Sequence, residues 1–133
     1  MLNPHDFLNG CQVSVEAPRY GVVKAKYVPD TFIAVFRDTQ ELTVVVPEDA
    51  LADEWVEEVD KGWKLLSFRT VLPFALTGFL AVVAQALAEE KIAIFALSAY
   101  STDHLLVKEE KVGQAMDKLT ALGCIISSLP PRG

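Results

Sequence analysis

Residues 76–108 read LTGFLAVVAQALAEEKIAIFALSAYSTDHLLVK, and the pattern of this stretch decides the fold. Its first part has apolar residues at positions 76, 79, 80, 83 and 87, which is the spacing of one face of a helix. We therefore expect a helix over residues 75–90. The continuous apolar run at 92–97 is short enough for a buried strand, and residues 105–108 predict another.

The flanking sequence completes the pattern. Residues 63–70 predict a strand before the helix. Residues 109–122 predict a second helix that ends at Gly123, and residues 124–129 predict a last short strand before Pro130. The resulting order of strand, helix, strand, strand, helix, strand is the ferredoxin-like βαββαβ arrangement, so we expect an α+β fold.

The strand at 92–97 is apolar on both of its faces, whereas a sheet that is covered on one side should alternate. We therefore expect the second face to be covered by the N-terminal half, by another subunit, or by both. A homodimer is expected, because closed two-fold assembly is the commonest oligomer and a small chain gains burial from it.

The N-terminal half is predicted to consist mostly of strands. Residues 11–16 and 23–27 alternate, and two apolar runs at 32–37 and 41–46 flank a turn at 38–40, which indicates a hairpin. Pro47 is expected to open a helix that reaches Asp60, with Leu51, Trp55 and Val59 as its apolar stripe. Its acidic residues are typical of a solvated face, although a partner surface is the alternative. We place the boundary at 60–62, where the predicted acidic helix ends and a new apolar run begins, which divides the chain into residues 1–61 and 62–133.

Composition narrows the class of protein. The chain has 133 residues, half of them hydrophobic, which is enough for one ordinary domain or two very small ones. Its net charge of −6 without a basic cluster argues against nucleic-acid binding. No run of about 18 apolar residues and no secretory signal is found, so we expect no membrane span and a cytoplasmic location. Cys11 and Cys124 form no CxxC pair, and we expect them to be reduced core residues.

Catalytic constellations are nearly missing from the sequence. Histidine occurs only at His5 and His104, and no hydrolase, metalloprotease, P-loop or dinucleotide motif is found. Asp103 and His104, near the acids at 109 and 110, suggest a metal site, but adjacent strand residues point to opposite faces. We therefore predict that the protein is not an enzyme and has no metal or cofactor.

Two segments are candidates for binding a ligand. Residues 72–80 lead into a helix, whose first amide groups lack partners and attract a carboxylate, and Gly78 would allow a close approach. The alternative is that Gly78 only lets the helix pack tightly. Residues 95–103 run from an apolar strand into a hydroxyl-rich turn, where Ser98 could bond a ligand and Asp103 could pair with an ammonium. The alternative is an ordinary hairpin turn.

Both segments, together with residues 41–47 and 62–63, resemble the ACT-domain subgroup that includes the CASTOR arginine sensors and many small bacterial proteins. The similarity spans about residues 30–125 and rests on LTGFL at 76–80 and IFALSAYSTDHLLVK at 94–108. It implies a fold that often binds amino acids between ACT modules, with a divergent ACT-like half before the recognisable one. By position it implies ligand contacts at Phe74, Thr77, Gly78, Phe95, Ala96, Ser98 and Asp103.

The chain also departs from this subgroup. Related sequences usually have an acid at the position of Pro73, and Thr and Asp at the positions of Ala99 and Ser101. These departures favour a neutral amino acid, or no ligand at all, over a strongly cationic ligand such as arginine. The resemblance implies a regulatory small-molecule sensor that acts through an unidentified protein partner. The alternative is an ACT-like structural module that dimerises and has no ligand.

Overall fold

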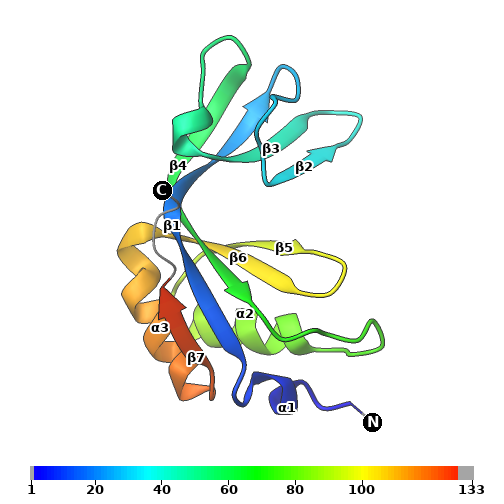
Figure 1. The fold of residues 1–133 in the computed structure, drawn as a ribbon, viewed down its shortest axis with the longest axis vertical. Helices are drawn as coiled ribbons and strands as arrows, with labels where there is room; N and C mark the ends of the chain where they lie inside the picture. Colours follow the sequence, from blue (N-terminus) through cyan, green and yellow to red (C-terminus); the bar gives the residue numbers. More distant parts are fainter. Residues whose placement is uncertain (1, 129–133) are drawn as a thin grey trace. The chain divides into compact units, whose positions relative to one another are not determined.

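The computed structural model describes residues 2–128, and the chain forms two compact units. Residues 1–17 and 64–133 make up the larger unit, and residues 18–63 the smaller. Two long strands, β1 (Gln12–Ala25) and β4 (Val56–Phe68), contribute residues to both units (Figure 1). The predicted boundary at 60–62 lies inside β4, where Gly62 has the positive φ of 82° that favours glycine. The division into two ACT-like halves stays a prediction.

The larger unit has the predicted element order. Its strands lie in the order β7-β1-β4-β6-β5, with β1 and β7 parallel and β5 and β6 antiparallel. The α+β fold with its βαββαβ-like order is therefore confirmed. Its remaining elements are α1 (Pro4–Leu8), α2 (Phe79–Glu89), β5 (Ile94–Ser98), β6 (Asp103–Lys108), η2 (Glu109–Lys111), α3 (Val112–Ala121) and β7 (Ile125–Ser128).

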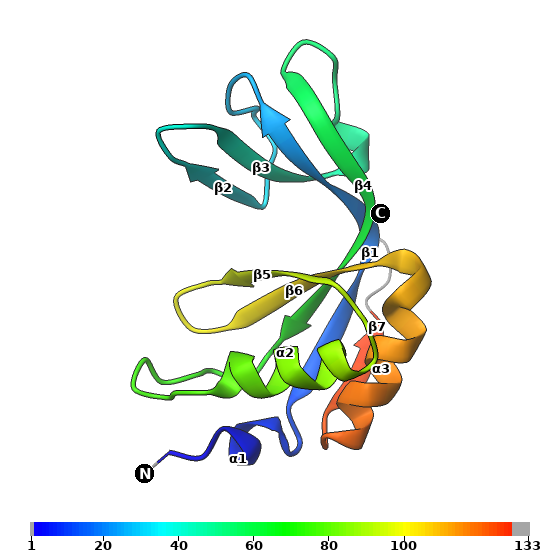
Figure 2. The ribbon, with the colours of Figure 1, turned by 180° about the vertical axis from the view of Figure 1, so that it is seen from behind.

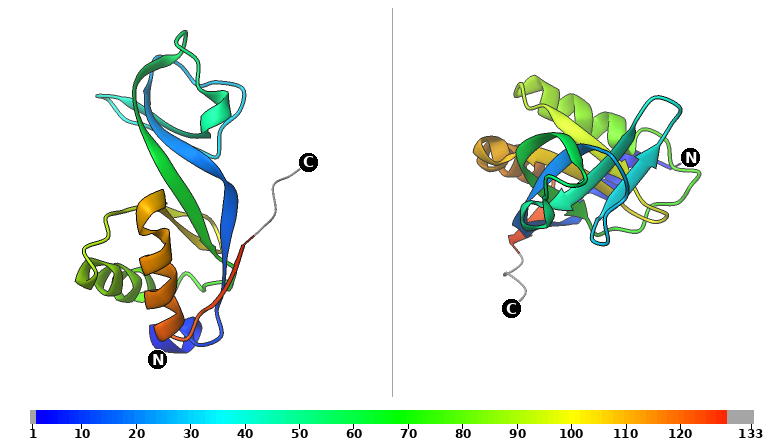
Figure 3. Two further views of the ribbon diagram at one scale, coloured as in Figure 1. Left: turned by 90° about the vertical axis from the view of Figure 1, so that its left-hand side faces the viewer. Right: turned by 90° about the horizontal axis from the view of Figure 1, so that it is seen from above.

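The core of the larger unit lies between its strands and its two long helices, α2 and α3 (Figure 3). Every second residue of a strand and one face of each helix point into this core. The apolar residues in the sequence therefore repeat with a period of 2 in the strands and of 3.6 in the helices. Removing one such buried leucine side chain costs about 2–5 kcal/mol. The fully buried side chains include Val13, Leu66, Phe68, Val83, Leu87, Leu105, Val107 and Leu119.

The short helix α1 lies beside the start of α2 (Figure 2). Asn3 caps α1 by accepting the amide of His5 at 3.0 Å, and Pro4 occupies the first turn, where a missing amide costs nothing. This helix was not predicted. Within residues 2–128 no helix is both long and apolar enough to cross a membrane.

The smaller unit confirms the predicted hairpin. Strands β2 (Ala34–Arg37) and β3 (Leu42–Pro47) pair antiparallel, and β3 pairs with β1. The Asp38 carboxylate accepts the amides of Gln40 and Glu41 at 2.7 and 2.8 Å, which closes the turn. These two bonds lower the pKa of Asp38.

The predicted acidic helix up to Asp60 is wrong. Only η1 (Glu48–Ala50) is helical, and residues 56–60 belong to β4. The amide of Lys26 donates to the Trp55 carbonyl at 2.8 Å, and Lys24 lies 3.6 Å from the Glu57 carboxylate. Trp55 is buried against the β1 and β3 side chains. A strand beside β1 thus pairs acidic residues with lysines, whereas a helix would place its acids next to one another.

Three further differences concern the ends and faces of elements. The helix predicted from residue 75 begins at Phe79. The two strands predicted at 11–16 and 23–27 form a single strand, β1. Strand β5 lies at the sheet edge with no residue buried, so the expected burial of both its faces is not met within the chain. The last predicted strand is present as β7, and Leu129 lies outside the described residues.

Candidate functional site

A cavity of about 330 Å³ lies in the larger unit between the loop before α2 and the turn that joins β5 to β6. This is near the lower end of the about 300–1,000 Å³ that is usual for small-molecule sites. The described residues that line it come only from these two segments and the first turn of α2. They are Leu72, Pro73, Phe74, Leu76, Gly78, Phe79, Leu80, Ala81, Ser98, Ala99, Tyr100, Ser101, Thr102 and Asp103.

Backbone hydrogen bonds hold the two segments together. The amide of Leu72 donates to the Ser101 carbonyl at 2.7 Å, so the loop before α2 is tied to the turn. Within the turn, the amide of Ala99 donates to the Thr102 carbonyl at 2.9 Å. The walls of the cavity are therefore fixed by main-chain contacts, and side-chain substitutions in them can be made without removing those contacts.

The start of α2 forms one wall. Gly78 precedes the helix with φ of +83°, and the amide of Val82 donates back to the Gly78 carbonyl at 2.9 Å. For the three amides before Val82, at residues 79–81, no acceptor is found among the described residues, and no side chain caps the helix. All three residues line the cavity. This wall therefore offers hydrogen-bond donors and the positive end of a helix dipole to a carboxylate.

Asp103 provides the opposite kind of group. It stands at the start of β6 in register with Ser98, whose hydroxyl donates to the Asp103 carboxylate at 2.7 Å. Among the described residues that line the cavity, Asp103 is the only one with a carboxyl group, and none is basic. The cavity thus combines amide donors, one carboxylate and an otherwise apolar or hydroxyl-bearing lining.

Two exposed aromatic rings stand at the rim. Phe74 and Tyr100 are 76% and 82% exposed, yet their ring centroids are 4.9 Å apart in an edge-to-face arrangement. Each comes from a different segment of the cavity wall. Such pairs contribute about 0.5–1.5 kcal/mol beyond area burial, so the contact helps to hold the two segments together.

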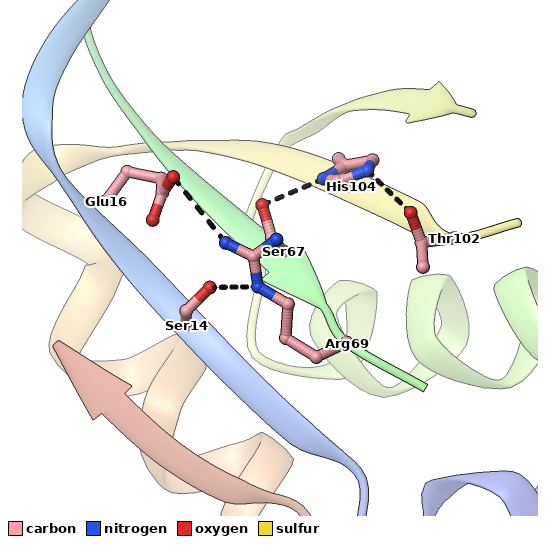
Figure 4. A network of polar contacts seen from close by, with 6 residues as sticks. All are labelled: Ser14, Glu16, Ser67, Arg69, Thr102 and His104. Carbon is pink, nitrogen blue, oxygen red and sulfur yellow. Dashed lines mark hydrogen bonds and ion pairs between the residues drawn. The ribbon is translucent and has the colours of Figure 1, made fainter. Parts of the chain in front are cut away.

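Figure 4 shows a set of polar contacts, in which Thr102 also belongs to the lining of the cavity. His104 contacts the Thr102 hydroxyl at 3.0 Å through Nε2 and the Ser67 hydroxyl at 2.8 Å through Nδ1. Arg69 donates to the Ser14 hydroxyl at 2.8 Å and lies 3.7 Å from the Glu16 carboxylate. Burial lowers the pKa of His104, and the positive charge of Arg69 adds to this, while Asp103 and Glu16 act in the opposite direction.

The structure brings together part of the predicted site. Phe74, Gly78, Ser98 and Asp103 all line the cavity. Thr77 is exposed and is not part of the lining, although its neighbours are. Phe95 and Ala96 pair with Leu106 and Leu105 on β6 and lie outside the lining as well.

The sequence prediction did not name Leu72, Leu80, Ala81 and Tyr100 as site residues, and all four line the cavity. Tyr100 had a usable signal, because an aromatic residue in a polar turn has no core to enter. Leu80 and Ala81 line the cavity because α2 begins later than predicted, which places its first turn at residues 79–82. Within residues 2–128 no group of three or more His, Cys, Asp or Glu side chains could hold a metal ion.

These features define the fold as one of the ACT type. The sequence model of the ACT domain family matches residues 58–121, which include most of β4 and all of α2, β5, β6 and α3. No curated protein sequence matches the chain.

Solved structures share this fold. A protein from Agobacterium tumefaciens aligns with a TM-score of 0.80 at 23% identity over 93% of this chain and 97% of its own. A Vibrio cholerae protein of unknown function, described as a possible transport protein, aligns with a TM-score of 0.74 at 23% identity over 87% and 92%. The ligand-free regulatory subunit of aspartate kinase from Thermus thermophilus aligns with a TM-score of 0.63 at 14% identity over 83% and 95%.

Proposed function

We propose that this protein is a regulatory module that binds a free amino acid with an uncharged side chain. The observation that carries the proposal is that one cavity is lined both by Asp103 and by residues 79–81, whose helix amides have no acceptor among the described residues. An α-amino acid carries a carboxylate and an ammonium on one carbon. The amides complement the first group and Asp103 complements the second.

The remaining lining argues for the uncharged side chain. Apart from Asp103, the cavity presents only apolar, hydroxyl-bearing or backbone groups, with Leu72, Leu76 and Leu80 among them. A charged ligand side chain would lose its hydration there and find no second partner of opposite sign. The sequence resemblance to the subgroup with the arginine sensors is compatible with this reading, because the chain departs from that subgroup at Pro73, Ala99 and Ser101.

The residues that line the cavity also support a binding protein and not an enzyme. The Ser98 hydroxyl donates to the Asp103 carboxylate, but the described residues of the lining include no histidine, lysine or cysteine that would complete a nucleophile and base set. The similarity in fold to the regulatory subunit of aspartate kinase supports a regulatory role. We propose further that the protein acts in the cytoplasm, as a homodimer and through a protein partner.

A second candidate function is a structural ACT-like module that dimerises and has no ligand. The exposed side chains beside the cavity favour it, since Val71, Phe74 and Tyr100 are each more than two thirds exposed. A second subunit that covers them would bury apolar area without any small molecule. This candidate and the sensor differ in whether a free amino acid binds the chain.

Thermal unfolding in the presence of each of the twenty amino acids separates the two. A ligand that binds only the native state adds about 2.7 kcal/mol at a hundredfold excess over its dissociation constant. This corresponds to an upward shift in the melting midpoint of about 5–10 °C for a chain of this size. The sensor predicts such a shift for one amino acid or a few related ones. No shift with any of them, together with a dimer in sedimentation, supports the structural module.

A further inference from the structure

Two thiols from opposite ends of the sequence lie side by side in the larger unit. Cys11 precedes β1 and Cys124 precedes β7, and these strands pair in parallel with Gln12 opposite Ile125. Backbone hydrogen bonds lie on either side of the cysteines: Gly10 donates to the Gly123 carbonyl and Ile125 to the Cys11 carbonyl, both at 2.8 Å. The two cysteines immediately precede the paired strands, and these two bonds bring them next to one another.

The backbone geometry suits a disulfide. Neighbouring strands lie about 4.7–4.9 Å apart, which is inside the Cα separation of about 4.4–6.8 Å that disulfides require. Residues that are opposite on paired strands also point to the same face, and both cysteines belong to the same core cluster. In this structure both are free thiols and are buried, with exposed fractions of 2% and 4%.

The two sulfur atoms also influence each other. A hydrogen bond from the Cys124 thiol lowers the pKa of Cys11, although burial opposes this effect. The same bond, together with burial, raises the pKa of Cys124. The pair is thus asymmetric, because the Cys11 thiol loses its proton more readily than the Cys124 thiol does.

We propose that Cys11 and Cys124 form a redox-active dithiol, which small disulfides such as oxidised glutathione convert to an intramolecular disulfide between the start of β1 and the start of β7. Because Cys11 is buried, the reaction requires local opening at the start of β1. The exposed Cys11 thiolate attacks one sulfur of oxidised glutathione, forms a mixed disulfide and releases one glutathione thiolate. Cys124 then loses its proton to solvent and attacks the Cys11 sulfur, which releases the second glutathione thiolate. Two protein thiols are oxidised and one glutathione disulfide is reduced to two thiols.

The bond would join two segments that are almost the whole chain apart. Cross-links stabilise chiefly by restricting the unfolded chain, and more so for long loops. Strand β1 also continues into the smaller unit, so the cross-link would fix the strand that both units share to the last described strand. We therefore expect the oxidised protein to be the more stable form, and its stability to respond to the thiol–disulfide balance around it.

The test uses the full chain in native buffer. Reduced protein is incubated with oxidised glutathione, quenched with an alkylating reagent and measured by intact mass. The expected product has lost two hydrogens, takes up no alkyl group and retains no glutathione, and a peptide map shows residues 11 and 124 joined. The oxidised form should melt about 5 °C or more above the reduced form, and dithiothreitol should reverse the shift.

Matched variants remove one thiol at a time. Cys11→Ser and Cys124→Ser, with Cys→Ala at each position as a second choice if serine disturbs the core, should show no midpoint rise on oxidation. Wild-type protein that keeps both thiols open to alkylation, or that yields mainly disulfides between chains, would overturn the proposal. So would an oxidised monomer that melts below the reduced one. None of these readings depends on whether the protein binds an amino acid.

Discussion

The hydroxyl of Ser98 donates to the carboxylate of Asp103 at 2.7 Å across one pair of the β5–β6 ladder, and both residues line the same cavity. The bond occupies one lone pair of the carboxylate and fixes its orientation. Several acceptor positions remain, because an ionised carboxylate has about four. Asp103 is therefore both positioned and still able to receive an ammonium group.

Replacing Asp103 with Asn should weaken binding of an α-amino acid tenfold or more. The substitution keeps the size of the side chain and removes its charge, and a charge-assisted contact is worth about 1.5–3 kcal/mol. Calorimetric titration of both proteins with the amino acid that shifts the melt measures the change. Ser98→Ala is the matched control, because it removes only the orienting bond and should cost less. Equal affinities for wild type and D103N would remove Asp103 from the site.

Replacing Gly78 with Ala should destabilise the protein and weaken binding. The φ of +83° costs an L-residue about 1–2 kcal/mol, and a Cβ there would lie 3.5 Å from Pro4, so strain and not a clash is the main effect. Gly113→Ala is the control. Its Cβ would meet nothing within 4 Å in α3, and alanine favours a helix by about 0.5–1 kcal/mol. Urea unfolding should therefore give changes of opposite sign, and changes of the same sign would contradict the account of Gly78.

Replacing Tyr100 or Phe74 with Ala should alter which amino acid binds best. The two rings are in contact at the rim, and a ligand side chain that leaves the cavity would meet them before it meets water. Loss of either ring should weaken large apolar ligands several-fold and leave glycine and alanine almost unchanged. Competition titrations over an aliphatic series measure this selectivity. A uniform loss across the series would mean that the rings only hold the two segments together.

Much of the larger unit could be predicted, because its signals are local. The apolar spacing from Leu76 to Leu87 and the short apolar run at 105–107 lead directly to α2 and β6. The predicted helix start at residue 75 was too early, because the left-handed backbone at Gly78 makes Phe79 the first helical residue. The two candidate segments do line one cavity, although Thr77, Phe95 and Ala96 do not take part in it.

The smaller unit could not be predicted to the same degree. Leu51, Trp55 and Val59 have helical spacing, yet Trp55 is buried beside Val44 and Val46, and residues 56–60 extend as a strand. The contacts that hold this segment as a strand are with β1, about 30 residues earlier in the sequence. Such distant contacts leave no pattern in the local sequence. The pairing of Cys11 with Cys124 is of the same kind, since their separation in the sequence gave no sign that β1 and β7 are neighbours.

His104 should make the stability of the protein fall on mild acidification. Burial and Arg69 lower its pKa in the folded state below the ordinary value of about 6.5, so the unfolded chain binds a proton first as the pH decreases. The contribution of neutral His104 is therefore complete above about pH 6.5 and declines as the pH falls from there towards the folded pKa.

Other groups titrate in the same range, so the informative quantity is the difference in unfolding free energy between wild type and His104→Gln. The glutamine keeps one donor and one acceptor for Ser67 and Thr102 but cannot be protonated in this range. Urea unfolding at pH 7.5, 6.5 and 5.5 should show that the unfolding free energy of the wild type, relative to that of the variant, decreases at each step. A difference that stays constant with pH would mean that the pKa of His104 is the same in the folded and the unfolded chain.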